Sequence, residues 1–113
     1  MVYFSDHGDD ADRGLGYGAS KITWPMARIP LVMWFSDDFR KERPETFAQL
    51  QAHEQAYWTN DLLYDVMLDL LGIEGMPHTD LQYDLASKDY RLAKENALTL
   101  HGSVKVADEK NME

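Results

Sequence analysis

The pair Asp6-His7 ends a short apolar run, Val2 to Phe4, and is followed at once by Gly8. A carboxylate oxygen and a neutral imidazole nitrogen are both good ligands for Zn²⁺ or Mn²⁺. Neighbouring side chains point to opposite faces within a strand, but where the strand ends and the chain turns, both can reach one cation. Gly8 would let the backbone turn sharply beside that cation. Taken alone, the same residues also fit a surface loop in which Asp6 caps a turn and His7 is solvated.

The other residues that could do chemistry form weaker patterns. The three aspartates within residues 9–12 could form a weak Mg²⁺ or Ca²⁺ patch, but they lack the ligand spacing and the final Glu of an EF-hand loop. His53 and Glu54 do not begin a His-Glu-x-x-His zinc motif, because Tyr57 stands where the second His would be. A solvated helix face is the better interpretation of that segment. The two remaining histidines favour ordinary turn positions: His78 and His101.

Composition limits the classes of function that the chain can have. Its 113 residues are 44% apolar, which is enough for one globular domain. The net charge is −9, with 20 acids against 11 bases, so a phosphate backbone would be repelled and no nucleic-acid partner is expected. The absence of cysteine excludes disulfides and thiolate zinc sites. No stretch is long and apolar enough to cross a membrane, and the first residues do not resemble a signal peptide, so the chain as given is expected to be soluble.

Two apolar segments predict the strands that would position the Asp6-His7 pair. Val2 to Phe4 has the composition of a strand end, and the glycine-rich stretch 5–27 predicts a long loop. Ile29 to Phe35 is apolar on both faces, which is typical of a strand in a sheet that helices cover on each side. In such α/β folds the site lies at the carboxyl ends of parallel strands.

Helical patterns follow the second strand. Residues 37–43 predict a charged surface turn or short helix, and Pro44 predicts the first turn of a helix with Phe47 and Leu50 on its apolar stripe, which Tyr57 could extend. Thr59 or Asn60 would cap the next helix, which Gly72 ends. Four aromatic side chains are expected in the core: Trp34, Phe35, Tyr57 and Trp58.

The last part of the chain has weaker signals. After Gly75 we expect loop with one short helical turn. Apolar and polar residues alternate enough in residues 97–108 to predict a small hairpin or edge strands. Residues 109–113 are expected to fray. The fold class is therefore α/β, with too few strands for a stable parallel sheet, so that the sheet looks incomplete as given.

Three ordered blocks of sequence resemble one known family. They are "VYFSDHGDD", "RIPLVMWFSDDF" and "TNDLLYDVMLDLLGIEG", which begin at residues 2, 28 and 59. Together they are similar to the C-terminal part of the catalytic domain of the alkaline phosphatase/sulfatase superfamily, and most like the bacterial phosphoethanolamine transferases. The resemblance implies a partial alkaline-phosphatase-like sheet with flanking helices over residues 1–108, of which residues 2 to 75 carry the likeness well.

The resemblance also implies roles for individual residues. Asp6 and His7 occupy the positions of two zinc ligands, with manganese as the alternative metal. The family's nucleophilic threonine lies upstream of these blocks, and no threonine of this chain stands in its context. Tyr17 stands where the family usually has a histidine that contacts metal or phosphate. A tyrosine there could still donate a hydrogen bond to a phosphate oxygen, so Tyr17 is a candidate substrate-binding residue.

A function follows from the resemblance as an expectation. The parent protein would be a metal-dependent phosphoryl or sulfuryl transfer enzyme, anchored in the inner membrane and facing the periplasm, with a phosphorylated lipid or glycan as substrate. This chain would supply metal ligands but not the nucleophile, and by itself is expected to be inactive. The alternative is a non-catalytic remnant or interaction module that covers its apolar strand edges by forming a homo-oligomer.

Overall fold

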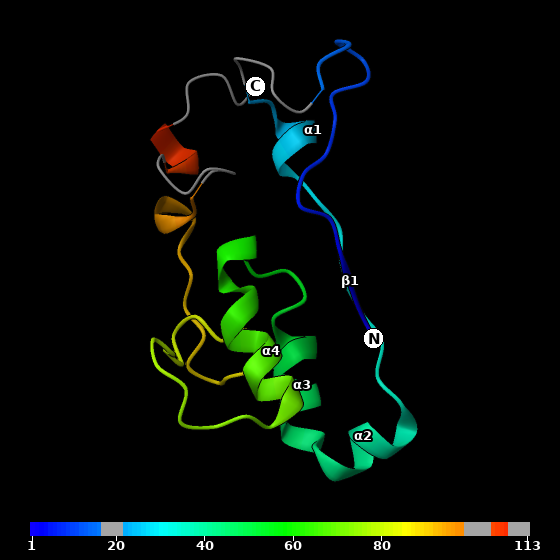
Figure 1. Ribbon diagram of the computed structural model, residues 1–113, viewed down its shortest axis with the longest axis vertical. Helices are drawn as coiled ribbons and strands as arrows, with labels where there is room; N and C mark the ends of the chain where they lie inside the picture. Colours follow the sequence, from blue (N-terminus) through cyan, green and yellow to red (C-terminus); the bar gives the residue numbers. More distant parts are fainter. Residues whose placement is uncertain (17–21, 99–104, 109–113) are drawn as a thin grey trace. The chain divides into compact units, whose positions relative to one another are not determined.

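The structure is a computed structural model that describes residues 1–16, 22–98 and 105–108 (Figure 1). The chain divides into two compact units, one of residues 1–35 with the chain from residue 98 onward, and one of residues 36–97. The prediction for Tyr17, the one for the fraying tail at 109–113 and most of the predicted C-terminal hairpin fall outside the described residues. Among the described residues, no helix has both the length and the apolar character needed to cross a bilayer.

The first unit holds both predicted strands. Strand β1 (Val2–Phe4) pairs with β2 (Leu31–Met33), and Phe4 lies opposite Leu31. The pairing is antiparallel, so the expectation of parallel strands is wrong for the described sheet. The backbone pairing continues beyond the ends of the two strands, since the Gly8 N–H donates to the Met26 carbonyl oxygen at 2.8 Å. The fold is thus a small α/β arrangement with a two-stranded sheet and several helices.

One face of this sheet is apolar and exposed. Strand register and alternation place Met1, Tyr3, Val32 and Trp34 on the same face, and each is at least half exposed. The predictions that Trp34 lies in the core and that helices cover both faces are therefore wrong for this structure. The described helical segments of the unit are too short to cover a sheet: α1 (Trp24–Ala27) and the 3₁₀ turn η3 (Val106–Asp108).

The ends of the first unit differ from the prediction in detail. The one-turn helix α1 lies within the stretch predicted as loop, with Pro25 in its first turn. Near the C-terminus, Leu98 and Lys105 form an isolated antiparallel bridge, as a hairpin would. Val106, however, starts a 3₁₀ turn and is buried, so the described residues 106–108 do not form a second strand.

Local signals fix the helices at the start of the second unit. Helix α2 (Asp37–Glu42) begins after Ser36, whose Oγ accepts a hydrogen bond from the Phe39 N–H at 3.2 Å. Helix α3 (Pro44–Ala52) begins at the predicted proline. Tyr57 lies beyond its end, so it does not extend the apolar stripe of Phe47 and Leu50.

Helix α4 carries the core of the second unit. The predicted helix begins as a 3₁₀ turn, η1 (Asn60–Leu62), and continues as α4 (Leu63–Leu71). Gly72 ends it with φ of 67°, a left-handed conformation that favours glycine. Val66 on α4 is fully buried. The chain after Gly72 is loop up to the 3₁₀ turn η2 (Lys94–Asn96), as predicted. This part of the chain contributes further buried side chains to the unit: Leu85, Ala86, Tyr90 and Ala97.

His53 ties that loop to the end of α3. Its Nδ1 lies 2.8 Å from the Leu85 carbonyl oxygen, and its ring lies 5.3 Å from the ring of Tyr90. The Tyr90 hydroxyl in turn donates to the Tyr57 carbonyl oxygen. His53 is therefore half-buried and structural, and not part of the solvated helix face that its sequence context predicts.

Candidate metal-ligand pair

Asp6 and His7 lie in a tight turn directly after β1. The Ser5 hydroxyl donates to the His7 carbonyl oxygen at 2.6 Å, and Asp6 Oδ1 accepts a hydrogen bond from the His7 N–H at 3.0 Å. These two local hydrogen bonds turn the backbone, so the side chains of Asp6 and His7 no longer point to opposite faces as they would in a strand. As a result, the Asp6 carboxylate and the His7 imidazole come to the same side, with His7 Nε2 3.8 Å from Asp6 Oδ1.

The hydrogen bonding of the His7 ring decides which nitrogen could bind a metal. Its Nδ1 lies 3.2 Å from the Gly8 carbonyl oxygen, which can only accept, so Nδ1 carries the proton. In the neutral ring, Nε2 then holds the lone pair, and Nε2 is the atom that faces Asp6. Metal-ligating histidines commonly donate their other ring N–H to a carbonyl in this manner.

The spacing of the two donor atoms also suits one cation. Two ligands that each lie about 2 Å from a tetrahedral zinc ion are separated by roughly 3.3 Å. The observed 3.8 Å needs only a small side-chain rotation to reach that value. The Asp6 side chain is 85% exposed and can make this movement, while that of His7 is 26% exposed and better fixed. The pair therefore fits a zinc or manganese ion chemically.

Gly8 holds this turn against α1. A Cβ at position 8 would collide with the Pro25 carbonyl oxygen, and the φ of Gly8 lies outside the left-handed region. Glycine is thus required here for close approach of two backbone segments, and not for the sharp turn that the sequence predicts. The Gly8 N–H donates to the Met26 carbonyl oxygen, so the ligand turn is attached to a buried part of the unit.

The described residues do not bring a third metal ligand to the pair. Within residues 1–16, 22–98 and 105–108, no group of three or more His, Asp or Glu side chains is placed to hold a metal ion. Asp10 is buried and instead stabilises its own turn, since its Oδ1 accepts from the Arg13 N–H at 3.2 Å. The aspartates of residues 9–12 therefore do not form a cation patch in this structure.

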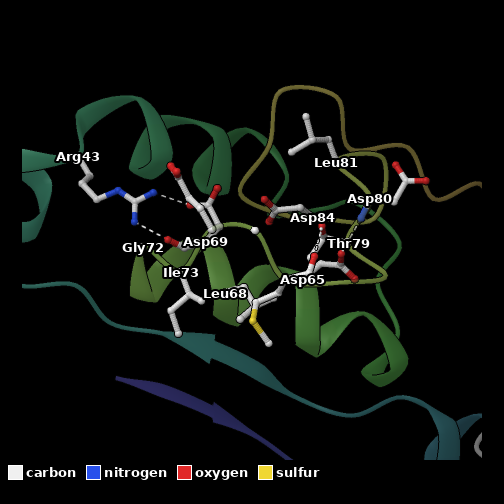
Figure 2. Close-up of a pocket in the computed structure, with 13 residues that line it drawn as sticks. Arg43, Asp65, Leu68, Asp69, Gly72, Ile73, Thr79, Asp80, Leu81 and Asp84 are labelled. Carbon is white, nitrogen blue, oxygen red and sulfur yellow. Dashed lines mark hydrogen bonds and ion pairs between the residues drawn. The ribbon is translucent and has the colours of Figure 1, made fainter.

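A pocket of about 320 Å³ is lined entirely by residues of the second unit, to which neither Asp6 nor His7 belongs (Figure 2). Arg43 lies at one end of it, and its guanidinium contacts Oδ1 and the carbonyl oxygen of Asp69, each at 2.5 Å. Most of the ionisable side chains that line it are acidic: Asp65, Asp69, Glu74, Asp80 and Asp84. Sequence reasoning missed this pocket. The one available signal was the spacing of Asp65 and Asp69, which puts two carboxylates on one side of an otherwise apolar helix.

Asp84 is the buried acid of this pocket. Only 4% of it is exposed, and its Oδ1 accepts a hydrogen bond from the Ala86 N–H at 2.9 Å. The pKa of Asp84 is raised from its ordinary 3.8 to about 7, chiefly by burial. The neighbouring carboxylates of Asp69 and Asp65 contribute to this rise, and the Ala86 hydrogen bond opposes it.

Comparisons with known proteins identify relatives of the chain. The family model described as Sulfatase matches residues 1–73. Two relatives are similar, the phosphoethanolamine transferase EptA of Escherichia coli O157:H7 and that of Escherichia coli strain K12. Each is 30% identical over 82 residues, which cover 66% of this chain and 14% of the relative. The chain thus spans about one seventh of the length of the curated relatives that it matches. No solved structure matches the chain.

Proposed function

The chain belongs to the sulfatase family, and on that premise we propose that it forms part of a metal-dependent phosphoethanolamine transferase, or of a related enzyme that transfers phosphoryl or sulfuryl groups. In this proposal Asp6 and His7 are two of the metal ligands, and the nucleophile is not supplied by this chain. The observation that carries the proposal is the placement of His7 Nε2, the lone-pair nitrogen of the neutral ring, 3.8 Å from Asp6 Oδ1.

The residues of the turn would have distinct tasks. A bound zinc ion, or manganese as the alternative, would polarise the phosphoryl group and lower the pKa of an attacking hydroxyl. Asp6 would contribute negative charge to the metal site, and His7 a neutral nitrogen. The Gly8 carbonyl oxygen would keep the proton of His7 on Nδ1, and the Ser5 hydroxyl would hold the turn. Tyr17 would donate a hydrogen bond to a phosphate oxygen of the substrate.

The substrate and setting of this proposal come from the relatives. EptA is a phosphoethanolamine transferase by name, so a phosphorylated lipid or glycan is the proposed substrate class of the whole protein. We further propose an inner-membrane anchor and a periplasmic catalytic domain for that protein. Nucleic acid is not a proposed partner, since a chain of net charge −9 repels phosphate backbones.

Zinc titration by calorimetry tests the ligand assignment directly. We expect the wild-type chain to bind one zinc ion weakly, because two protein ligands are fewer than a closed zinc site uses. His7→Ala and Asp6→Asn should each weaken that binding by at least about tenfold, because the loss of a supporting residue alone can cost that much.

A matched variant controls for histidines elsewhere in the chain. His78 is exposed in a loop at φ of 62°, and asparagine tolerates that conformation, so His78→Asn removes an imidazole without new strain. We expect it to bind zinc as the wild type does. Equal zinc affinity of the wild type and His7→Ala would show that the ligand assignment is wrong.

A second candidate function is self-association without catalysis. One observation favours it, namely the exposed apolar face formed by Met1, Tyr3, Val32 and Trp34. Large exposed apolar patches commonly mark protein–protein contacts. A second copy of the chain is the occupant that this candidate requires, in keeping with the usual two-fold symmetry of small homo-oligomers.

A further inference from the structure

We propose that Asp84 and Asp69 share one proton between their carboxyl groups, and that this proton holds the loop of residues 73–93 on helix α4. The loop, which we call the latch loop, faces α4 across the pocket, with Asp84 on the loop and Asp69 on the helix (Figure 2). Asp84 is 4% exposed, and Asp69 lines the same pocket. Since ionised carboxylates are acceptors only, a hydrogen bond between the two side chains requires a proton on one of them.

The position of Asp84 prevents its carboxyl group from turning out to water. Its Oδ1 is held by the Ala86 N–H at 2.9 Å, and the two residues that follow it, Leu85 and Ala86, are themselves buried. His53, at the end of α3, fixes the same segment through the Leu85 carbonyl oxygen at 2.8 Å. The Asp84 carboxyl group therefore faces α4 as long as the latch loop is in place.

The charges around the pair favour the protonated form. Helix α4 presents Asp65 and Asp69 to Asp84. Glu74 and Asp80 of the latch loop also line the pocket, but both are exposed, so solvent screens their charges from Asp84. Among the described residues that line the pocket, Arg43 is the one cation, and its guanidinium is bound to the Asp69 carboxylate and carbonyl oxygen. Arg43 thus compensates the charge of Asp69, and no second cation of the described pocket lining is left for Asp84.

Loss of the proton would leave two facing carboxylates in a poorly solvated place. Burial disfavours the charged form of Asp84, and its raised pKa of about 7 places the ionisation near neutral pH. Because the folded form holds this proton more tightly than the unfolded chain does, the proton stabilises the unit at low pH, and this contribution is lost as pH rises from about 4 to about 7. The latch loop would then loosen from α4 above neutral pH and open the pocket.

The test compares urea unfolding midpoints at pH 5.5 and pH 8.5 for the full chain and two variants. Asp84→Asn carries a neutral amide that can accept from Ala86 and donate to Asp69, as the protonated acid does. We expect the wild-type midpoint to fall between pH 5.5 and pH 8.5, and that of Asp84→Asn to fall much less. At pH 8.5 the variant should be the more stable protein.

Asp80→Asn is the matched control. Asp80 Oδ1 accepts from the Gln82 N–H at 2.9 Å, the same two-residue turn as at Asp84, but Asp80 is exposed. The unfolding midpoint of Asp80→Asn should match that of the wild type at both pH values. The contributions of all other titrating groups then cancel in the comparison. An equal fall in the wild type and Asp84→Asn would overturn the proposal.

A second measurement needs no variant. A ¹³C NMR titration of the wild-type chain follows the side-chain carboxyl carbon of Asp84. Titration near pH 7 would support the shared proton, and titration near pH 4 would refute it.

Discussion

At the scale of single residues, Gly8 is the position that most constrains the ligand turn. A side chain there would overlap the Pro25 carbonyl oxygen, which cannot move away without straining the hydrogen bond from Gly8 to Met26. We expect Gly8→Ala to destabilise the chain by about 1–3 kcal/mol, as overpacking of a tight contact does. The change would be measured as a lower urea unfolding midpoint.

Gly16 offers the control for this prediction. A Cβ at position 16 would meet the Asp9 side chain at 3.7 Å, an ordinary van der Waals distance, and its φ needs no glycine. Gly16→Ala should therefore leave the midpoint close to that of the wild type. If both alanine variants were equally stable, close approach would not be the reason for Gly8.

Sequence reasoning can select residues whose neighbours in space are also neighbours in the chain. Asp6 and His7 are adjacent and follow a strand, so they could be selected from the sequence and are indeed brought to the same side. His53 and Asp84 could not be interpreted in this way. The partner of His53 is the carbonyl of Leu85, 32 positions away, and Asp84 is buried only because the latch loop packs on α4.

At the scale of elements, features set by local sequence were likewise predicted, and features set by distant contacts were not. Local signals predicted the start of α3 at Pro44 and the end of α4 at Gly72, because each acts on the backbone within a few residues. The direction of strand pairing was missed. It depends on the path of the segment between β1 and β2, which the Gly8–Met26 contact fixes and which strand composition does not reveal.

The latch loop is an element that periodicity cannot identify. It contains no helix or strand between Ile73 and Ala93, yet it supplies much of the buried surface of its unit. Its order comes from side-chain contacts with other elements, at His53, Tyr57 and Asp65. The family match ends at residue 73, so it covers the ligand pair and stops before Asp84.

At the scale of the whole molecule, the exposed apolar face of the sheet predicts self-association of the isolated chain. Trp34 and Tyr3 are both 58% exposed on that face. We expect sedimentation velocity to show concentration-dependent oligomers of the wild type, and Trp34→Lys to shift the population toward monomer, because a charge on this face opposes its burial.

Leu71 provides the comparison for this prediction. It is 64% exposed but lies at the end of α4, in the other unit. Leu71→Lys should leave the oligomer population unchanged. A wild-type chain that stays monomeric at high concentration, or equal effects of the two lysine variants, would contradict a role of the sheet face.

The central claim is that the Asp6-His7 turn binds a divalent metal through His7 Nε2, and ¹⁵N NMR of the imidazole during zinc addition tests it most directly. The Gly8 carbonyl oxygen holds the proton on Nδ1, so we predict that zinc shifts the Nε2 resonance of His7 while Nδ1 keeps its proton. The Asp6→Asn variant should need more zinc for the same shift. A His7 ring whose Nε2 resonance does not respond to zinc would contradict the account.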